Sequence, residues 1–395
     1  MPVTVRKYRK IMREVVEIGL GREARRTYGL DDITIVPNRR TRSSKDVDTS
    51  WTIDAYHFGI PVLAQPSDAL TSVDFISEMG RLGGAAVINA EGLWGRVADM
   101  DAAVEQIVST AFDEEGYDDG QMTNRAIPLL QKLHGLPLDK DLLSDRIRDV
   151  RASGVTTVVR VSPQNARELA PVVAAAGAEI VVIQGTLISA EHVSADGTPL
   201  NLKEFIGSLD VPVIAGSVLD YTTAMHLMRT GAAGIIVGGG STTNADTLGI
   251  DAPKATAIAD AAAARRDYLD ETGGRYVHVI ADSELETSGE MAKAIACGAD
   301  AVMLGSPLSQ AKEAAATGYY WPSVAAHPRF PRGVIENLVI ERDEAPFLEK
   351  VLMGPATEPF GSLNLIGGVR RSMAKAGYTN LKDFQKVQLS VRSWL

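Results

Sequence analysis

The hydrophobic positions of the chain follow two alternating periods from residue 59 onward. Short, almost continuous apolar runs, such as GIPVLAQP (59–66) and EIVVIQG (179–185), are separated by longer stretches with helical spacing, such as TSVDFISEMGRLG. Brief apolar runs between turn signals are typical of strands buried on both faces. Such strands alternating with helices predict a parallel sheet that is covered by helices.

The strand pattern occurs often enough to close a barrel. The segments that have it are 59–66, 85–90, 156–162, 179–185, 211–217, 232–239, 276–283 and 300–306. Helical patterns such as PQNARELAPVVAAAG and TSGEMAKAIACG separate most of them. Strand–helix units of this number over roughly 250 residues predict a (β/α)8 TIM barrel. An open doubly wound sheet is the alternative.

Two segments interrupt the alternation. Residues 97–140 contain the acidic stretch AFDEEGYDDG and then the helical pattern AIPLLQKLHGL. Residues 318–395 are rich in Pro, Gly and aromatic residues at first. We interpret 97–140 as a short insertion and 318–395 as a cap over one barrel face, within a single domain that spans 1–395.

The composition of the chain limits which classes of binding partner and which cellular compartment we expect. The formal net charge of −10 argues against nucleic acid, because phosphate backbones are bound by clustered Lys and Arg. The single cysteine, Cys297, excludes an intrachain disulfide and is compatible with a reducing cytosol. No apolar run reaches the roughly 18 residues of a membrane helix, and the basic N-terminal segment lacks the apolar core of a signal peptide. We therefore expect a cytoplasmic protein without a membrane partner.

The barrel prediction also says where chemistry should lie, because barrel active sites form at the C-terminal ends of the strands. The polar residues that follow predicted strands are Gln65, Ser67, Asp68, Asn89, Glu91, Gln184, Thr186, Ser217, Asp282, Ser283 and Ser306. The loop after the sixth strand reads GGGSTTNAD and carries three consecutive hydroxyl side chains.

Two of these positions suggest a nucleotide. Barrels often bind phosphate after strands seven and eight on backbone N–H groups, and Gly305-Ser306-Pro307 suits that role. An ordinary tight turn with an N-cap serine is the alternative. Asp282, at the end of a strand, could hold a ribose diol, or could cap the following helix.

Three reactive side chains carry weaker signals. Cys297 lies in a helical pattern before a strand, and buried cysteines of that kind are usually inert. His278 shares a strand face with Asp282 but lies deeper, as a core histidine would. Lys254 could be a Schiff-base lysine of an aldolase-like barrel, although a solvated lysine fits better. The histidines lack metal-ligand spacing, so no metal site is expected.

Three segments resemble the family of inosine monophosphate (IMP) dehydrogenases and guanosine monophosphate (GMP) reductases. They are LDDITIVPNRRTRSSKDVD (30–48), VIADSELETSGEMAKAIACGADAVMLGS (279–306) and LIGGVRRSMAKAGY (365–378). Residues 97–140 are too short to hold the family's regulatory CBS modules, so the chain resembles the branch that lacks them. The resemblance implies an oxidoreductase barrel that binds a purine nucleoside monophosphate with NAD or NADP and assembles as a homo-tetramer or octamer.

The resemblance also implies roles for individual residues. Asp282 would bind the ribose, Arg332 and Gly333 would contact the substrate base, and Gln184 would lie near the nicotinamide. The phosphate-binding residues would be Ser241, Gly305, Ser306 and Tyr320, and the glycines beside the cofactor would be Gly238, Gly239 and Gly240.

The same loop departs from the family at the catalytic position. Family members carry Gly-x-Gly-x-Gly-Ser-x-Cys-Thr-Thr, and that thiol attacks C2 of the purine. Here the position falls on Thr242 or Thr243, depending on the end from which the shortened loop is counted, and a threonine hydroxyl is a much poorer nucleophile.

Three further regions differ. Glu284 or its neighbour falls where the family has a glycine next to the phosphate, Ser217 replaces a frequent Asn, and AQPSDAL differs from Ala-Met-Asp while keeping Asp68. Three hypotheses therefore stand: an oxidoreductase with altered or lost activity, a nucleotide-sensing or assembly paralogue, and an unrelated phosphate-binding barrel such as an isomerase or flavin enzyme.

Overall fold

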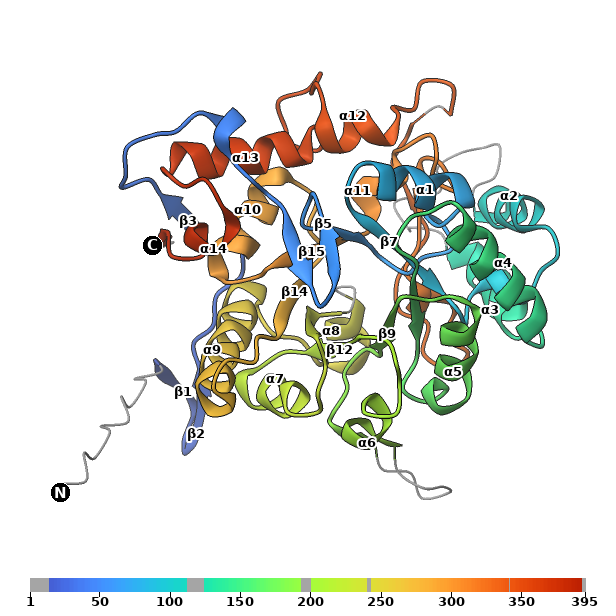
Figure 1. The fold of residues 1–395 in the computed structure, drawn as a ribbon, viewed down its shortest axis with the longest axis horizontal. Coiled ribbons are helices and arrows are strands. Elements are labelled where there is room, and N and C mark those ends of the chain that lie inside the picture. Colours follow the sequence, from blue (N-terminus) through green and yellow to red (C-terminus); the bar gives the residue numbers. More distant parts are fainter. Residues whose placement is uncertain (1–13, 112–123, 193–199, 240–242, 341, 393–395) are drawn as a thin grey trace.

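The computed structural model describes residues 14–111, 124–192, 200–239, 243–340 and 342–392 (Figure 1). Within them, parallel strands close into a barrel in the order β12-β13-β14-β15-β6-β7-β8-β9. The ring closes where Val302 of β15 pairs with Val62 of β6. The predicted (β/α)8 barrel is therefore confirmed, and the open sheet is excluded.

Every barrel strand falls inside a segment that the hydrophobic pattern predicted, or within one residue of it. The strands are β6 (Val62–Ala64), β7 (Ala85–Asn89), β8 (Val158–Val161), β9 (Ile180–Gln184), β12 (Val213–Val218), β13 (Gly234–Gly238), β14 (His278–Asp282) and β15 (Ala301–Leu304). Most of their residues are buried, since neighbouring side chains fill the barrel and helices cover its outside.

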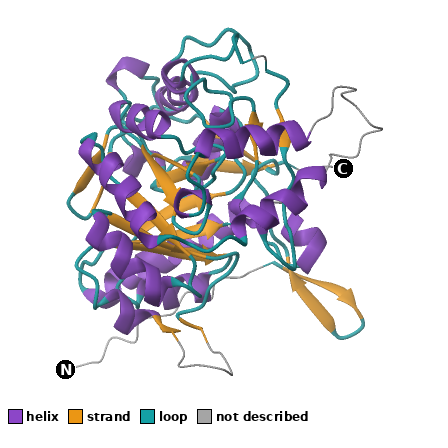
Figure 2. Ribbon diagram, turned by 90° about the vertical axis from the view of Figure 1, so that its right-hand side faces the viewer, coloured by secondary structure: helices purple, strands orange, loops and turns teal. Residues whose placement is uncertain are grey.

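The helices surround this barrel (Figures 1 and 2). Those that follow barrel strands are α1 (Val73–Arg81), α4 (Lys140–Ala152), α5 (Ala166–Ala176), α6 (Leu202–Ile206), α7 (Tyr221–Met228), α8 (Thr243–Leu248), α9 (Lys254–Thr272), α10 (Ser288–Cys297) and α11 (Ser306–Ser309). Helix α10 begins with a capping box between Thr287 and Glu290, so its N-cap is Thr287. Asp282 therefore does not cap the following helix, which was the alternative interpretation of this residue.

The bottom of the barrel is closed by the hairpin of β4 (Trp51–Ile53) and β5 (Tyr56–Phe58). Ile53 is fully buried, and a Cβ on Gly234 at the start of β13 would lie 3.2 Å from its Cδ1. A second hairpin, β1 (Val15–Gly19) with β2 (Arg22–Arg25), is attached to α9 through an ion pair between Arg25 and Asp260.

The segment 97–140 contains more helix than the sequence pattern predicted. Helix α2 (Met100–Ala111) precedes the predicted helix, which is α3 (Ile127–His134). Ala103, Val104 and Ile107 form the buried face of α2. The acidic stretch at 112–123 lies outside the described residues.

The segment 318–395 covers the barrel mouth with only its first part. The short strands β16 (Tyr319–Tyr320) and β17 (Glu336–Asn337) pair there. The later elements are α12 (Leu348–Met353), α13 (Leu365–Lys375), α14 (Leu381–Phe384) and β18 (Gln388–Val391). Helices α12 and α13 pack against α1 and α10, and β18 pairs with β3 (Ile33–Val36) near the other end of the chain.

An ion-pair cluster joins this tail to the barrel. Asp300, immediately before β15, accepts hydrogen bonds from Arg265 (2.6 Å), the Tyr276 hydroxyl (2.8 Å) and Lys382 of α14 (2.5 Å). Burial raises the pKa of Asp300, but the cations outweigh burial and hold that pKa at about 2. Among the described helices, none is long and apolar enough to cross a membrane.

Candidate functional site

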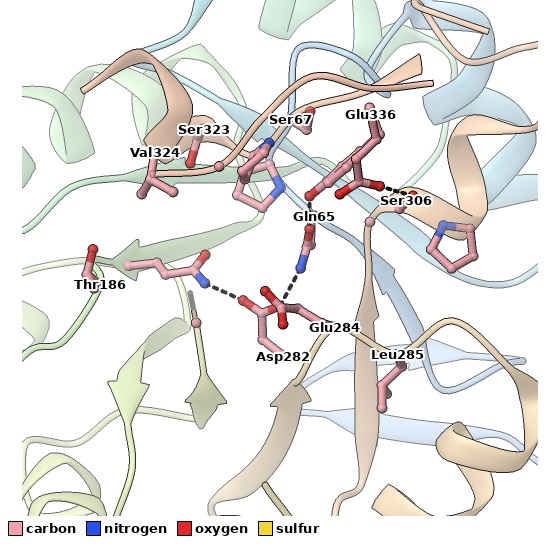
Figure 3. A pocket seen from close by; sticks show the side chains of 18 of the residues that line it. Gln65, Ser67, Thr186, Asp282, Glu284, Leu285, Ser306, Ser323, Val324 and Glu336 are labelled. Carbon is pink, nitrogen blue, oxygen red and sulfur yellow. Dashed lines mark hydrogen bonds between the residues drawn. The ribbon is translucent and has the colours of Figure 1, made fainter. Parts of the chain in front are cut away.

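A cavity of about 610 Å³ lies at the C-terminal mouth of the barrel (Figure 3). Its walls are the ends of β6, β8, β9, β13, β14 and β15, together with the segment 320–336 of the tail. The location agrees with the rule for barrel enzymes. It brings together side chains that lie far apart in the sequence.

Asp282 is at the centre of the cavity wall. Gln65 Nε2 donates to its Oδ1 at 2.5 Å and Gln184 Nε2 donates to its Oδ2 at 2.9 Å (Figure 3). The residue is only 5% exposed, and burial raises the pKa of its carboxyl to about 6, although both amide hydrogen bonds act in the opposite direction. A further hydrogen bond extends this network, since the Tyr320 hydroxyl donates to Gln65 Oε1.

The end of β13 is held against Asp282 by two glycines with positive φ. A Cβ on Gly238 would lie 1.8 Å from the Asp282 carbonyl oxygen, and one on Gly239 would lie 1.5 Å from Ser217 Oγ. Gly239 donates its N–H to the same Asp282 carbonyl at 2.9 Å. The glycines are therefore required by close packing and by backbone conformation.

The two residues expected to form a phosphate cradle are engaged with protein groups. A Cβ on Gly305 would lie 2.2 Å from Gln65 Oε1 and 2.5 Å from the Tyr320 hydroxyl, so these side chains cover that glycine. Ser306 donates its hydroxyl to Glu336 Oε2 at 2.5 Å. Burial, and then the nearby carboxylates, raise the pKa of the Tyr320 hydroxyl well above its ordinary value.

The cavity is acidic. Among the described residues that line it, Arg160 is the one basic side chain. The lining carboxylates are Asp246, Asp282, Glu284, Glu286, Glu290 and Glu336. Figure 3 shows Asp282, Glu284 and Glu336 around the same hollow, with Thr186 on the opposite side from Ser306 and Glu336. Burial and the neighbouring Glu286 raise the pKa of Glu336, as expected where carboxylates gather.

A second cavity of about 540 Å³ continues from the first and has the opposite charge. Arg160, Gly185, Thr186, Ser323 and Val324 line both cavities. The charged and ionisable residues of the second cavity are Glu91, Arg96, His134, Arg160, His327 and Arg332.

Glu91 is the one carboxylate among the described residues that line the second cavity, and it is fully engaged. It accepts hydrogen bonds from the Ser162 hydroxyl at 2.8 Å and from Asn165 Nδ2, and it pairs with Arg160 at 3.3 Å.

Arg332 is buried in the wall of the second cavity, with 6% of its surface exposed. It donates to the Thr186 hydroxyl and to the Phe330 carbonyl, both at 3.0 Å, while its Nε has no partner. Burial lowers the pKa of its guanidinium, and no carboxylate among the described residues raises it.

The structure assigns the candidate site residues from the sequence to the first cavity, to the second cavity or to neither. Gln65, Ser67, Gln184, Thr186, Asp282, Gly305, Ser306, Tyr320, Gly239 and Gly333 line the first cavity, and Asn89, Glu91 and Arg332 line the second. Asp68, Ser217, Ser283 and Gly238 line neither of them. Asp68 instead accepts the N–H of Leu93 at 3.2 Å and lies 3.2 Å from His134 Nε2, which is a packing role.

The loop that carries the hydroxyl run lies largely outside the described residues. Gly240, Ser241 and Thr242 belong to that part, and Thr243 begins α8 with a side chain that is also outside the description. Lys254 pairs with Asp251, which leaves the Schiff-base interpretation without support. The expected roles of the loop residues therefore stay predictions.

The side chains considered for reactivity are also placed. His278 packs edge-on against Trp51 and Tyr276, and burial lowers its pKa to about 4, so it is a neutral core histidine. Cys297 ends α10, and burial raises the pKa of its thiol to about 12. The described residues contain no group of His, Cys, Asp and Glu that could hold a metal ion.

Two site residues were missed in the sequence. Arg160 is charged and half-way along the strand TTVVRVS, a position that should have drawn attention in an apolar run. Glu336 belongs to a tail segment without clear periodicity, so only the fold places it beside Ser306.

The comparisons with known proteins agree with this fold. The model of the "IMP dehydrogenase / GMP reductase domain" matches residues 27–326. An uncharacterized oxidoreductase of Mycolicibacterium smegmatis is 61% identical, over 96% of this chain and 100% of the relative. The inosine-5′-monophosphate dehydrogenase of Methanocaldococcus jannaschii is 25% identical, over 92% of each chain. The crystal structure of an IMP dehydrogenase/GMP reductase-like protein from Corynebacterium glutamicum has 63% sequence identity and a TM-score of 0.90, covering 96% of this chain and 98% of that one.

Proposed function

Because the chain belongs to the IMP dehydrogenase / GMP reductase family, we propose that its mouth cavity binds a purine nucleoside monophosphate beside NAD or NADP, and that its redox chemistry is altered or lost. The observation that carries the proposal is the buried carboxylate of Asp282. Each of its oxygens receives one amide hydrogen bond and keeps a lone pair for a further donor. A ribose diol supplies two such donors.

The residues around Asp282 also fit a nicotinamide cofactor. Gln184 donates its Nε2 to Asp282, while its buried Oε1 has no hydrogen-bond partner in the described part of the chain. That oxygen can accept an N–H from the carboxamide of a nicotinamide ring, and Gly239 keeps the adjoining wall free of side-chain bulk. The cofactor, when bound, supplies hydride transfer, and the protein's share is to position the purine and exclude water.

The proposal of altered chemistry rests on the absence of a cysteine from the sequence of the loop after β13. The sequence has one cysteine, Cys297, which lies at the end of α10 rather than in the loop after β13. The covalent addition typical of the family uses a thiolate, and a threonine hydroxyl is a much poorer nucleophile. A nucleotide-sensing or assembly paralogue is therefore the second candidate, and the missing thiol is the observation that favours it.

One set of measurements tests the proposal. The protein is incubated with IMP and NAD⁺, and separately with GMP and NADPH, while absorbance of the reduced cofactor is followed. Calorimetry measures binding of inosine, IMP and GMP to the wild type, to Asp282→Asn and to the control Asp270→Asn, an exposed position of α9 that lines neither cavity. We expect nucleoside binding that Asp282→Asn abolishes and the control keeps. Binding without turnover would favour the sensor, and no binding of any purine ligand would refute both candidates.

Cysteine insertion tests the catalytic position. Thr242→Cys and Thr243→Cys each place a thiol at one of the two positions to which the family cysteine can be aligned. Turnover gained at one position, and lost on alkylation, would identify the equivalent residue. Homo-oligomeric assembly and a cytoplasmic location are further parts of the proposal, and light scattering on purified protein tests the first of them.

A further inference from the structure

The two contiguous cavities divide the site into an acidic end and a basic end. The acidic end, near strands β14 and β15, holds Glu284, Glu286 and Glu336. The basic end, beyond Thr186, holds Arg96 and Arg332, and its one carboxylate among the described lining residues, Glu91, is already paired. Any ligand that spans both cavities therefore meets a strong charge gradient.

The acidic end opposes a phosphate dianion. Ser306 gives its hydroxyl to Glu336, and the side chains of Gln65 and Tyr320 cover Gly305. A phosphate placed there would lose these donors to protein groups and would lie among carboxylates in a partly desolvated cavity. Like charges in such surroundings repel strongly, because the effective dielectric constant is well below that of water.

The basic end contains what an anion needs. Within the described part of the chain, Arg332 is almost completely buried, makes no ion pair, and has a buried Nε without a hydrogen-bond partner. Buried cations are normally paired, so an isolated one at a cavity wall calls for an anion from outside the protein. The planar fork of an arginine matches two oxygens of a phosphoryl group.

Two neighbours of Arg332 can complete the site. Thr186 accepts a hydrogen bond from Arg332, which leaves its own hydroxyl proton for a phosphoryl oxygen. His327 accepts the N–H groups of Arg329 and Phe330 on its Nδ1, at 3.2 Å and 2.9 Å, so in its neutral form the ring proton is on Nε2. Both residues line the second cavity.

We propose that the second cavity is a phosphoryl subsite anchored by Arg332, so that a phosphoryl group of the bound ligand lies toward β9 rather than at the Gly305–Ser306 turn. The inference rests on the proposed function, because it assumes a nucleotide whose ribose is held by Asp282. The phosphoryl group belongs either to the purine nucleoside monophosphate or to the dinucleotide cofactor, and both present the same oxygens to the guanidinium.

Paired ligands that differ by one phosphate test the subsite. Calorimetry compares IMP with inosine, and nicotinamide mononucleotide with nicotinamide riboside, on the intact protein. The variants are Arg332→Gln, Arg332→Lys and Ser306→Ala, and the matched control is Arg329→Gln, which removes an exposed arginine three residues away. Thermal unfolding of each variant verifies that it folds.

The expected result is that the phosphate strengthens binding about tenfold or more within one ligand pair, as a charge-assisted hydrogen-bond pair should. Arg332→Gln removes that gain, Arg332→Lys restores part of it, and Arg329→Gln and Ser306→Ala keep it. The pair that responds identifies the source, IMP for the substrate and nicotinamide mononucleotide for the cofactor.

Three results would overturn the subsite. A phosphate gain that survives Arg332→Gln but disappears in Ser306→Ala would locate the phosphate at the Gly305–Ser306 turn. The absence of a gain in both pairs, with inosine still bound, would refute the subsite while leaving the proposed function intact. If neither nucleoside nor nucleotide binds, the proposed function fails and the subsite fails with it.

Discussion

Replacing Asp282 by Asn should make the protein more stable and should abolish the proposed binding of ribonucleosides. The carboxyl is buried, and its pKa rises from its ordinary value of 3.8 to about 6 in the folded protein. The folded state therefore binds this proton more tightly than the unfolded chain does. The resulting penalty is absent below about pH 4, grows between the two pKa values and is complete above pH 6.

The size of the effect follows from that shift. A rise from 3.8 to about 6 corresponds to about 3 kcal/mol, at about 1.4 kcal/mol for each pH unit. Asn has no charge to bury, and its amide can be satisfied because the unpartnered Oε1 of Gln184 can turn toward it. Gln65 keeps its orientation, since its Oε1 accepts the Tyr320 hydroxyl. We expect a gain of about 2 to 3 kcal/mol near pH 7.5 and about 1 kcal/mol near pH 4.5.

Urea unfolding of wild type and Asp282→Asn at these two pH values measures the gain, and calorimetry with inosine measures the loss of binding. The same titration predicts that the wild type binds ribonucleosides more weakly as the pH falls through about 6, because protonation removes the acceptor. A variant that is less stable than wild type near pH 7.5, or a difference that does not change with pH, would refute the reasoning.

Three other variants test separate parts of the structure. Asp300→Asn should cost about 3 to 5 kcal/mol near neutral pH, because Arg265 loses its buried partner; since the pKa of Asp300 is held at about 2, urea unfolding should show that cost shrinking as the pH falls from about 4 toward 2. Gly239→Ala should destabilise the protein by about 2 kcal/mol or more and abolish inosine binding, as its Cβ would meet Ser217 Oγ; unchanged calorimetry and unfolding would contradict the close packing at the end of β13. Cys297→Ala should leave ligand binding and any turnover unchanged, and a loss of either would show that the thiol takes part.

The barrel was predictable because strands that are buried on both faces of a parallel sheet appear in the sequence as continuous apolar runs. The segment 276–283 contains β14, and 300–306 contains β15, each with small errors at the ends. Helix α2 was missed although Ala103, Val104 and Ile107 have helical spacing, because the acidic stretch that follows suggested a loop for the whole segment. Pairing of β18 with β3 depends on contacts across the chain, which a local pattern does not contain.

The position of the candidate site was predictable from the sequence, but the distribution of charge within its cavities was not. The rule for strand ends brought Gln65, Gln184 and Asp282 together correctly, because the barrel geometry alone decides which ends meet. The same rule says nothing of which donors are already used. The way the tail folds over the mouth makes Ser306 donate its hydroxyl to Glu336, and it leaves Arg332 without a carboxylate partner among the described residues.

The closure between β15 and β6 has a consequence for synthesis on the ribosome. Val62 can pair with Val302 only after roughly 240 further residues have been synthesised, and β3 can pair with β18 only after an even longer stretch. At about 5–20 residues per second, the edge of β6 stays unpaired for on the order of tens of seconds. Contacts so distant in sequence also slow the closing step itself. The growing chain therefore exposes an apolar strand edge from the synthesis of β6 until that of β15. We expect the yield of folded protein to depend on chaperones more strongly than for a protein whose strands pair with strands nearby in the sequence.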